Sequence, residues 1–89
     1  MSFFQKFAVM NASGPLCTTL EELEIIAASE SDYVVMKSST LEPRQGNEEP
    51  RYYSFPGGSI NSMGLPNLGY EKYIEFSHIL VEKYKKPVI

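Results

Sequence analysis

Lys37 is the first residue whose type and position could do chemistry. It directly follows the apolar run YVVM at residues 33–36, which is typical of a buried strand. In parallel sheets and barrels ligands bind at the carboxyl ends of the strands, and Lys37 would emerge there. Its ammonium is a positive point charge that can neutralise a phosphate, a carboxylate or an anionic cofactor ring. A solvated lysine at a strand end is the alternative, and position alone does not choose between the two.

The turn NASGP at residues 11–15 is a second candidate site. Gly14 lets another group approach the backbone closely, so bare N–H groups beside Ser13 could meet a flat ligand. The turn is not a GxGxxG loop and carries no Walker lysine, so it does not indicate a phosphate-binding loop. From the local sequence, an ordinary tight turn is the favoured interpretation.

A third candidate combines Asn61, the MGL segment at residues 63–65, and Asn67. An asparagine amide offers both an acceptor and donors, which suits a planar polar ligand carrying both kinds of group. Gly64 would let backbone groups reach that ligand. Two asparagines in a loop are more often turn formers, so the local sequence favours the structural interpretation here as well.

The elements that must position these residues follow an α/β pattern. Aromatic residues and Val9 in the first ten residues indicate a strand or short hairpin. The spacings Thr18-x-x-Glu21 and Thr19-x-x-Glu22 both fit a capping box, and the helix they open should fade near residues 29–32. Residues 33–36 then form a strand covered on both faces. This order predicts a βαβ unit with parallel strands and a right-handed crossover.

Residues 41–58 contain three prolines and three glycines and allow no long regular element, and residues 59–67 continue this irregular stretch. A second helix is predicted from Tyr70 onward, with Lys83, Lys85 and Lys86 in its final turn and Pro87 stopping it, and Val88 and Ile89 begin another strand. We interpret this ending as a cut in a longer α/β protein. The expected apolar stripe of the second helix consists of Tyr70, Tyr73, Ile74, Ser77, Leu80, Val81 and Tyr84.

Composition excludes several functional classes. The 89 residues carry 8 Lys and Arg against 11 Asp and Glu, so the net charge is 8 − 11 = −3, which argues against nucleic-acid binding. No polybasic run or long apolar stretch indicates membrane attachment. A single cysteine and a single histidine exclude a disulfide framework and make a metal or Cys-His site within the chain improbable. We expect Cys17 to be a packing residue, His78 a surface or packing residue, and the protein to be cytoplasmic.

Four stretches, in order and at compatible spacing, resemble the amino-terminal part of the dihydroorotate dehydrogenases. The last of them is most similar to the class 1A, fumarate-using branch. The similarity covers nearly all 89 residues, and four motifs in register are far more specific than any one alone. The stretches are MNASG at 10–14, MKSSTLEPR at 36–44, GN at 46–47 with PRY at 50–52, and GSINSMGLPNLG at 58–69.

The resemblance implies that residues 1–89 are the amino-terminal part of a single FMN-binding (β/α)₈ TIM-barrel domain. It implies oxidation of dihydroorotate to orotate in pyrimidine biosynthesis, with fumarate as acceptor, in a full-length homodimer. A base removes a proton from C5 while a hydride passes from C6 to the flavin, and the protein supplies orientation and electrostatics. The base, a cysteine in the family, belongs to later strands and does not match Cys17, so residues 1–89 alone should be inactive.

The resemblance also assigns roles by position. Lys37 matches the lysine that contacts flavin and substrate and stabilises negative charge on the reduced flavin. Arg44, Pro50 and Arg51 match the loop that supports this lysine and covers the site, with Pro50 at a position that resembles a cis-proline turn. The flavin-contacting residues are Ala12, Ser13, Gly14, Lys37 and Ser38, and the orotate-binding residues are Lys37, Asn61, Met63, Gly64 and Leu65.

Two departures and two alternatives accompany this interpretation. Glu48 follows Gly46-Asn47 where the family often has proline, and Pro56-Gly57 replaces bulkier or charged residues. The first alternative is a small non-enzymatic α+β binding or interaction domain that retains the motifs. The second is the NAD-linked branch of the same family, against which residues 59–67 argue by resemblance only.

Overall fold

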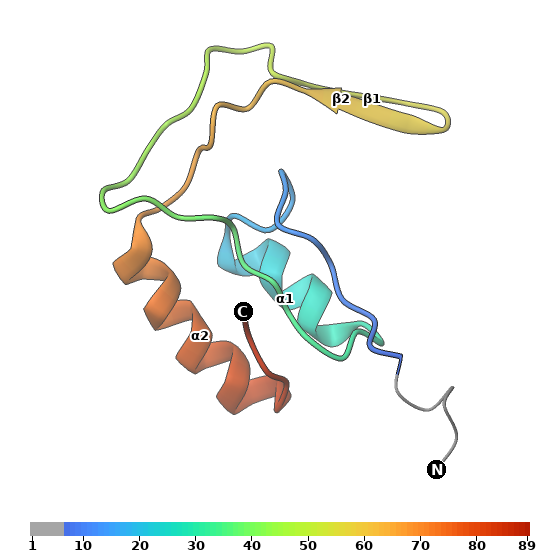
Figure 1. Cartoon of the computed structure of the whole chain (residues 1–89), viewed down its shortest axis with the longest axis vertical. Helices are drawn as coiled ribbons and strands as arrows, with labels where there is room; N and C mark the ends of the chain where they lie inside the picture. The colour runs from blue at the N-terminus through green and yellow to red at the C-terminus, as the bar shows by residue number, and fades with distance from the viewer. Residues whose placement is uncertain (1–6) are drawn as a thin grey trace.

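A computed structural model describes residues 7–89 and contains two helices and one two-stranded sheet (Figure 1). Phe3 and Phe4, which belong to the predicted first strand, lie outside the described residues. In chain order the elements are α1 (Leu20–Ala28), β1 (Tyr52–Phe55), β2 (Gly58–Asn61) and α2 (Tyr70–Tyr84).

Helix α1 begins at the second of the two predicted capping boxes. The Thr19 side chain accepts a hydrogen bond from the Glu22 N–H at 3.2 Å, while the Glu22 carboxylate accepts from the Thr19 N–H at 3.1 Å. Glu22 also accepts from the Thr18 N–H at 2.9 Å, so one carboxylate satisfies two of the free donors of the first turn. The helix ends at Ala28, with Ser29 as its C-cap, as predicted.

Helix α2 begins as predicted but ends at Tyr84, with Lys85 as a left-handed C-cap, so Lys85 and Lys86 lie beyond the last turn in which they were expected. The predicted apolar stripe is also partly wrong. The buried residues are Tyr73, Phe76 and Leu80, whereas Ile74 and Val81 are 53% and 46% exposed. Apolar residues occur on more than one side of this helix, so periodicity alone does not fix which side packs. Packing against α1 selects the side with Tyr73, Phe76 and Leu80.

Three short segments lie side by side in parallel and confirm the βαβ prediction. Met10 pairs with Tyr33, and Val34 pairs with Val88, both in parallel. The Val34 N–H donates to the Pro87 carbonyl at 3.0 Å, and the Ile89 N–H donates to the Val34 carbonyl at 2.8 Å. Each pairing is a single bridge rather than a full strand, so the predicted strands are present in shortened form.

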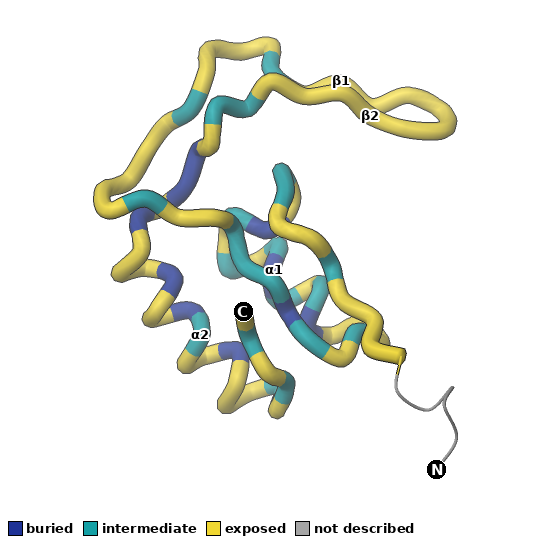
Figure 2. Tube along the Cα trace, viewed as in Figure 1, coloured by how far each residue is buried: buried dark blue, intermediate teal, exposed yellow. Residues whose placement is uncertain are grey.

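Both helices pack on the same side of these parallel segments. The core consists of residues from α1, from α2, from the turn before α1 and from the central segment, and Figure 2 marks buried positions in both helices and in that segment. Cys17, 2% exposed, is one of them, which confirms its expected packing role. The remaining core residues are Leu23, Ala27, Val34, Tyr73, Phe76 and Leu80.

The β1–β2 hairpin corrects the sequence interpretation. Residues 59–61 were expected to be irregular, but they pair antiparallel with β1 in the register Tyr52 to Asn61. Pro56 and Gly57 form the two-residue turn, in which Gly57 has a φ of 98° that favours glycine. Both strands are exposed throughout and extend away from the helices (Figures 1 and 2), so no burial pattern marks them in the sequence.

The Glu24 carboxylate links the two helices and gives a testable pH dependence. It accepts hydrogen bonds from Lys83 Nζ at 2.8 Å and the Tyr84 hydroxyl at 2.7 Å, and these lower the pKa of Glu24, Lys83 having the larger effect. A lowered carboxyl pKa adds stability above the unfolded-state pKa, which is lost as the pH falls through the folded-state pKa. Glu24→Gln should therefore lower the melting temperature at pH 7, and the difference from wild type should shrink as the pH falls below about 4.5.

Thermal unfolding of both proteins between pH 3 and pH 8 measures this effect. Glu82→Gln is the matched control, because Glu82 is exposed on α2 beside Lys83 and pairs with none of residues 7–89. A melting difference for Glu24→Gln that stays constant down to pH 3 would contradict the assignment.

Candidate functional site

The first candidate group gathers at the carboxyl ends of the parallel segments. The Asn11 amide donates to the Val35 carbonyl at 2.7 Å and accepts from the Val35 N–H at 2.8 Å, so it acts as a further backbone partner of that segment. Ser13 Oγ lies 3.0 Å from Ser38 Oγ and accepts from the Ser38 N–H at 2.9 Å. These contacts hold the turn of Ala12, Ser13 and Gly14 beside Lys37 and Ser38.

Lys37 is half-buried, yet its ammonium is unpaired within the described chain. Its backbone N–H donates to the Cys17 carbonyl at 3.0 Å, which fixes the position from which the side chain starts. Among residues 7–89, Nζ has no hydrogen-bond acceptor or carboxylate partner. A half-buried cation without a partner is suited to an anionic ligand.

The second candidate group is the loop at residues 62–66. Its carbonyl oxygens are used internally: Met63 accepts from the Asn47 N–H at 2.7 Å, Gly64 from Arg44 Nε at 2.7 Å, and Leu65 from Asn67 Nδ2 at 3.1 Å. The N–H groups of Met63, Gly64 and Leu65 donate to no other described residue. Residues 63–65 therefore offer three successive N–H donors, and each of their carbonyl oxygens already accepts a hydrogen bond.

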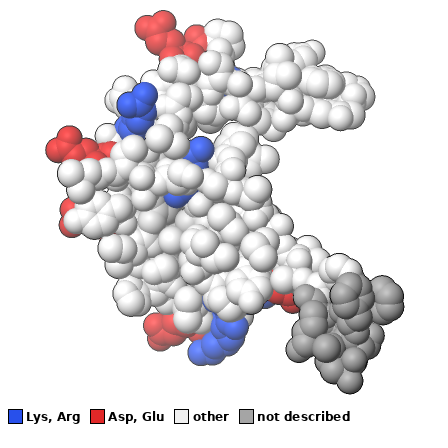
Figure 3. Space-filling model, in the orientation of Figure 1, with Lys and Arg blue, Asp and Glu red and all other residues white. Residues whose placement is uncertain are grey.

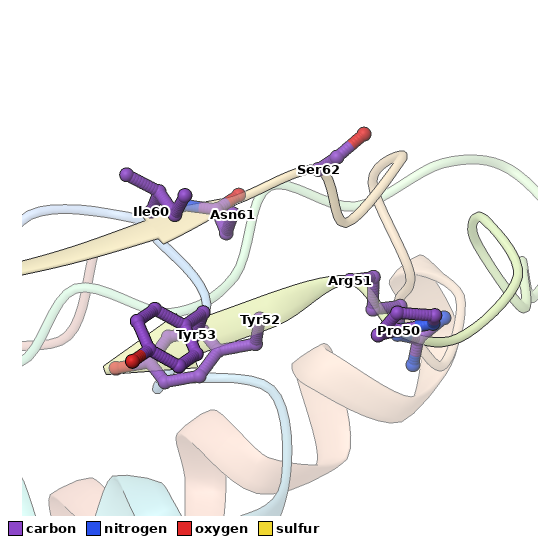
Figure 4. A pocket seen from close by; sticks show the side chains of 7 residues that line it. All are labelled: Pro50, Arg51, Tyr52, Tyr53, Ile60, Asn61 and Ser62. Carbon is purple, nitrogen blue, oxygen red and sulfur yellow. The ribbon is translucent and has the colours of Figure 1, made fainter. Parts of the chain in front are cut away.

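Asn61 lies at the end of β2, where its exposed amide makes no hydrogen bond with any of residues 7–89. It borders a hollow of about 370 Å³ at the base of the hairpin. Figure 4 shows Asn61 and Ile60 on one strand, Tyr52 and Tyr53 on the other, and Arg51 with Pro50 beside them.

Arg51 and Pro50 hold the segment that faces the loop. Arg51 Nη1 donates to the carbonyls of Gln45 at 2.6 Å and Asn47 at 3.0 Å, while its Nε contacts Glu49 at 2.9 Å. The peptide bond between Glu49 and Pro50 is cis, as the resemblance implied. Arg51 thus ties the segment into a compact turn despite the absence of proline after Asn47.

A larger hollow lies between the first turn and the hairpin, and among the described residues neither Lys37 nor residues 61–66 line it. It has a volume of about 690 Å³, with Ala12 and Gly14 of the first turn on one side and Tyr52 and Ser59 of the hairpin on the other. The space-filling view shows an indentation between hairpin and body, on a face where charged side chains lie mainly at the rim (Figure 3). No hydrogen bond within residues 7–89 joins Lys37 to the Asn61 group directly.

Sequence reasoning missed the positioning role of three asparagines. Asn11 and Asn47 were seen only as turn or motif residues, and Asn67 was weighed as a ligand contact. Asn67 is instead 3% exposed and fully occupied by protein partners. A signal was available, because a short amide side chain next to an irregular loop can replace missing backbone partners.

Other functional classes find no support in the described part of the chain. Residues 7–89 contain no group of three or more His, Cys, Asp or Glu side chains arranged to hold a metal ion. Within the same residues, neither helix combines the length and apolar character needed to cross a bilayer. His78 is exposed on α2, as expected.

The fold is of the α/β class, with the first candidate group at the carboxyl ends of its parallel segments. A family model described as dihydroorotate dehydrogenase matches residues 4–89. The chain belongs to the dihydroorotate dehydrogenase family.

Curated relatives agree with this assignment. The dihydroorotate dehydrogenase (fumarate) of Trypanosoma cruzi (strain CL Brener) is 54% identical over 79 residues, which are 89% of this chain and 25% of the relative. The probable dihydroorotate dehydrogenase A (fumarate) of Enterococcus faecalis is 56% identical over 68 residues, 76% of this chain and 22% of the relative. The dihydroorotate dehydrogenase A (fumarate) of Lactococcus lactis subsp. cremoris (strain MG1363) is 55% identical over 73 residues, 80% of this chain and 24% of the relative. The chain spans about a quarter of the length of these relatives.

Gly46 gives a test of the contact between the two loop segments. A Cβ at this position would overlap the Met63 carbonyl oxygen and lie 2.9 Å from Arg51 Nη1, and its φ is 83°. Gly46→Ala should therefore destabilise the protein by more than the roughly 1–2 kcal/mol expected from the left-handed conformation alone. Thermal or denaturant unfolding measures the difference.

Gly57→Ala is the matched control. Gly57 also has a positive φ, 98°, but a Cβ there would meet no atom within 4 Å. Equal destabilisation by the two substitutions would mean that the close approach of Gly46 to Met63 is unimportant.

Proposed function

We propose that this chain forms the amino-terminal part of a (β/α)₈ barrel that oxidises dihydroorotate to orotate. In this proposal the full-length protein is an FMN-dependent oxidoreductase of pyrimidine biosynthesis, and residues 1–89 supply part of one active site. Family membership supports the activity. The observation that carries the proposal is the row of three unpaired N–H groups at Met63, Gly64 and Leu65.

Orotate and dihydroorotate each carry a carboxylate next to a planar ring with amide-like groups. Successive backbone N–H groups form a concave donor site that favours an anion, so residues 63–65 suit the carboxylate. The free amide of Asn61 can donate to and accept from the ring. The Lys37 ammonium adds the positive charge that a bound anion needs in a partly dry site.

The residues of the first group fit FMN. The backbone of Ala12 and Ser13 is exposed, and a Cβ at Gly14 would meet nothing closer than 3.8 Å, so a flat ring could approach this turn. Lys37 and Ser38 lie at the same edge and offer a cation and a hydroxyl. When bound, FMN would supply the acceptor for the hydride that leaves C6 of dihydroorotate.

Each group of this chain then has a defined task. Residues 12–14 and Ser38 orient the cofactor, Asn61 and residues 63–65 orient the substrate, and Lys37 stabilises negative charge between them. Arg44, Pro50 and Arg51 support the loop that closes over the substrate. Cys17 is buried behind the turn and serves packing, so the base that takes the C5 proton must come from another part of the full-length protein.

The order of the parallel segments supports a barrel. Met10, residues 33–34 and Val88 pair in sequence order, while α1 and α2 share one core on the same side. A doubly wound sheet would put helices on both faces, whereas a barrel keeps all helices outside. Exposed apolar residues such as Val9, Ile25 and Leu41, each more than 60% exposed, support coverage by further elements.

Fumarate is the proposed electron acceptor, because the names of the relatives above carry it. The NAD-linked branch is the alternative, and acceptor assays with fumarate and NAD distinguish the two. The proposed assembly is a cytoplasmic homodimer, which a molar mass measured by light scattering would test.

The full-length protein should purify yellow and reduce fumarate with dihydroorotate as donor. Release of the pigment by denaturation and mass measurement should identify FMN at about one molecule per chain. A protein that remains colourless after incubation with FMN and does not oxidise dihydroorotate would overturn the proposed function and favour a non-enzymatic binding domain.

Lys37→Gln should lower the turnover of dihydroorotate in the full-length enzyme by at least about a hundredfold. Loss of one preorganised electrostatic group at an active site commonly has an effect of this size. Steady-state kinetics with fumarate measures it. Lys72→Gln, an exposed position on α2, is the control and should keep wild-type turnover.

A further inference from the structure

We propose that Asn47 and Asn67 are positioning residues for the substrate carboxylate. They hold the carbonyls of residues 62–65 toward the protein, together with Arg44, and so leave the N–H groups of residues 63–65 for an anion. We call this arrangement the carbonyl clamp. The inference rests on the proposed function. It assigns Asn47 and Asn67 an indirect part in substrate binding, since neither side chain touches the substrate.

The clamp engages four successive carbonyl oxygens. Asn47 Nδ2 donates to the Ser62 carbonyl at 2.9 Å, and the Asn47 N–H donates to the Met63 carbonyl at 2.7 Å. Arg44 Nε donates to the Gly64 carbonyl at 2.7 Å, and Asn67 Nδ2 donates to the Leu65 carbonyl at 3.1 Å. The Ser62, Met63 and Gly64 carbonyls share their peptide groups with the N–H groups of residues 63, 64 and 65, so their hydrogen bonds fix the directions of these three donors. The Leu65 carbonyl precedes Pro66, which has no N–H, and its bond to Asn67 keeps this oxygen away from the anion.

Asn67 connects the clamp to the rest of the site. Its Oδ1 accepts from the Thr40 N–H at 3.1 Å and from the Gly69 N–H at 2.9 Å, while Nδ2 also donates to Thr40 Oγ1 at 3.0 Å. Thr40 lies three residues after Lys37, so one buried amide joins the lysine segment, the loop and the start of α2. Its 3% exposure protects these bonds from competition by water.

The loop backbone needs such support. Gly64 and Leu65 have φ values of 77° and 60°, and leucine rarely adopts the left-handed region without a structural reason. A Cβ on residue 64 would lie 2.5 Å from the Asn47 side chain, so Asn47 packs directly against Gly64. Asn47 and Asn67 thus enclose the two residues whose conformations are least favourable by themselves.

The clamp predicts a specific loss of carboxylate recognition. In full-length enzyme, Asn47→Ala should raise the dissociation constant for orotate about fivefold to tenfold, the size expected for one lost hydrogen bond. Bound flavin should stay at the wild-type value, and the melting temperature should fall only slightly, because Asn47 is exposed and its side chain bonds only to Ser62. The affinity for uracil, which has the ring but no carboxylate, should change less than twofold.

Asn67→Asp separates the two halves of the Asn67 amide. The aspartate keeps the oxygen that accepts from Thr40 and Gly69 but loses the N–H that donates to the Leu65 carbonyl. The dissociation constant for orotate should therefore rise, by a larger factor than the turnover number at saturating dihydroorotate falls. Gln45→Ala is the matched control, since this exposed amide lies in the same segment and its side chain bonds to none of residues 7–89.

The outcomes separate the clamp from the proposed function. The clamp alone would be overturned if the wild-type enzyme oxidised dihydroorotate and both Asn47→Ala and Asn67→Asp bound orotate with wild-type affinity. If both variants lost affinity for orotate and for uracil equally, and lost bound flavin as well, the clamp would also be overturned, because that pattern indicates a general structural role. Wild-type protein that binds no orotate would overturn the proposed function and the clamp with it.

Discussion

The burial of Val34 between two helices and two parallel neighbours is the constraint on which the rest of the structure depends. This side chain is fully buried, packs with residues of both α1 and α2, and its backbone pairs with the segment at Pro87 and Ile89. Lys37 follows three residues later, so its position at the segment end is set by the core. The first turn is then fixed to the same segment through Asn11 and Ser13.

The loops of this chain are organised by side-chain amides and a guanidinium rather than by regular sheet pairing. Asn11 substitutes for a backbone partner of Val35, whereas Asn47 and Asn67 engage carbonyls of the loop between β2 and α2. Such bonds satisfy buried or partly buried polar groups while leaving the chain free to turn. A loop stabilised in this way can expose donors to a ligand without losing its shape.

The sequence predicted some elements well because their signals are local. The capping box at Thr19 and the start of α2 depend on residues within a few positions of each other. The parallel order joins distant residues, but it follows from the alternation of strand and helix signals along the chain. The hairpin was missed because both its strands are exposed and show no alternation, so only Pro56-Gly57 marks it. The buried side of α2 was missed in part because that side depends on contact with α1.

The sequence by itself determined which residue types lie near the ends of the parallel segments, including Lys37 and the asparagines, and its motif order indicated the family. Only the tertiary structure decided which asparagine is free and which is occupied. Asn61 ends an exposed strand, and its amide bonds to none of residues 7–89, whereas Asn67 is buried among Thr40, Leu65 and Gly69. The two residues are chemically identical, and only their burial and long-range partners distinguish recognition from support.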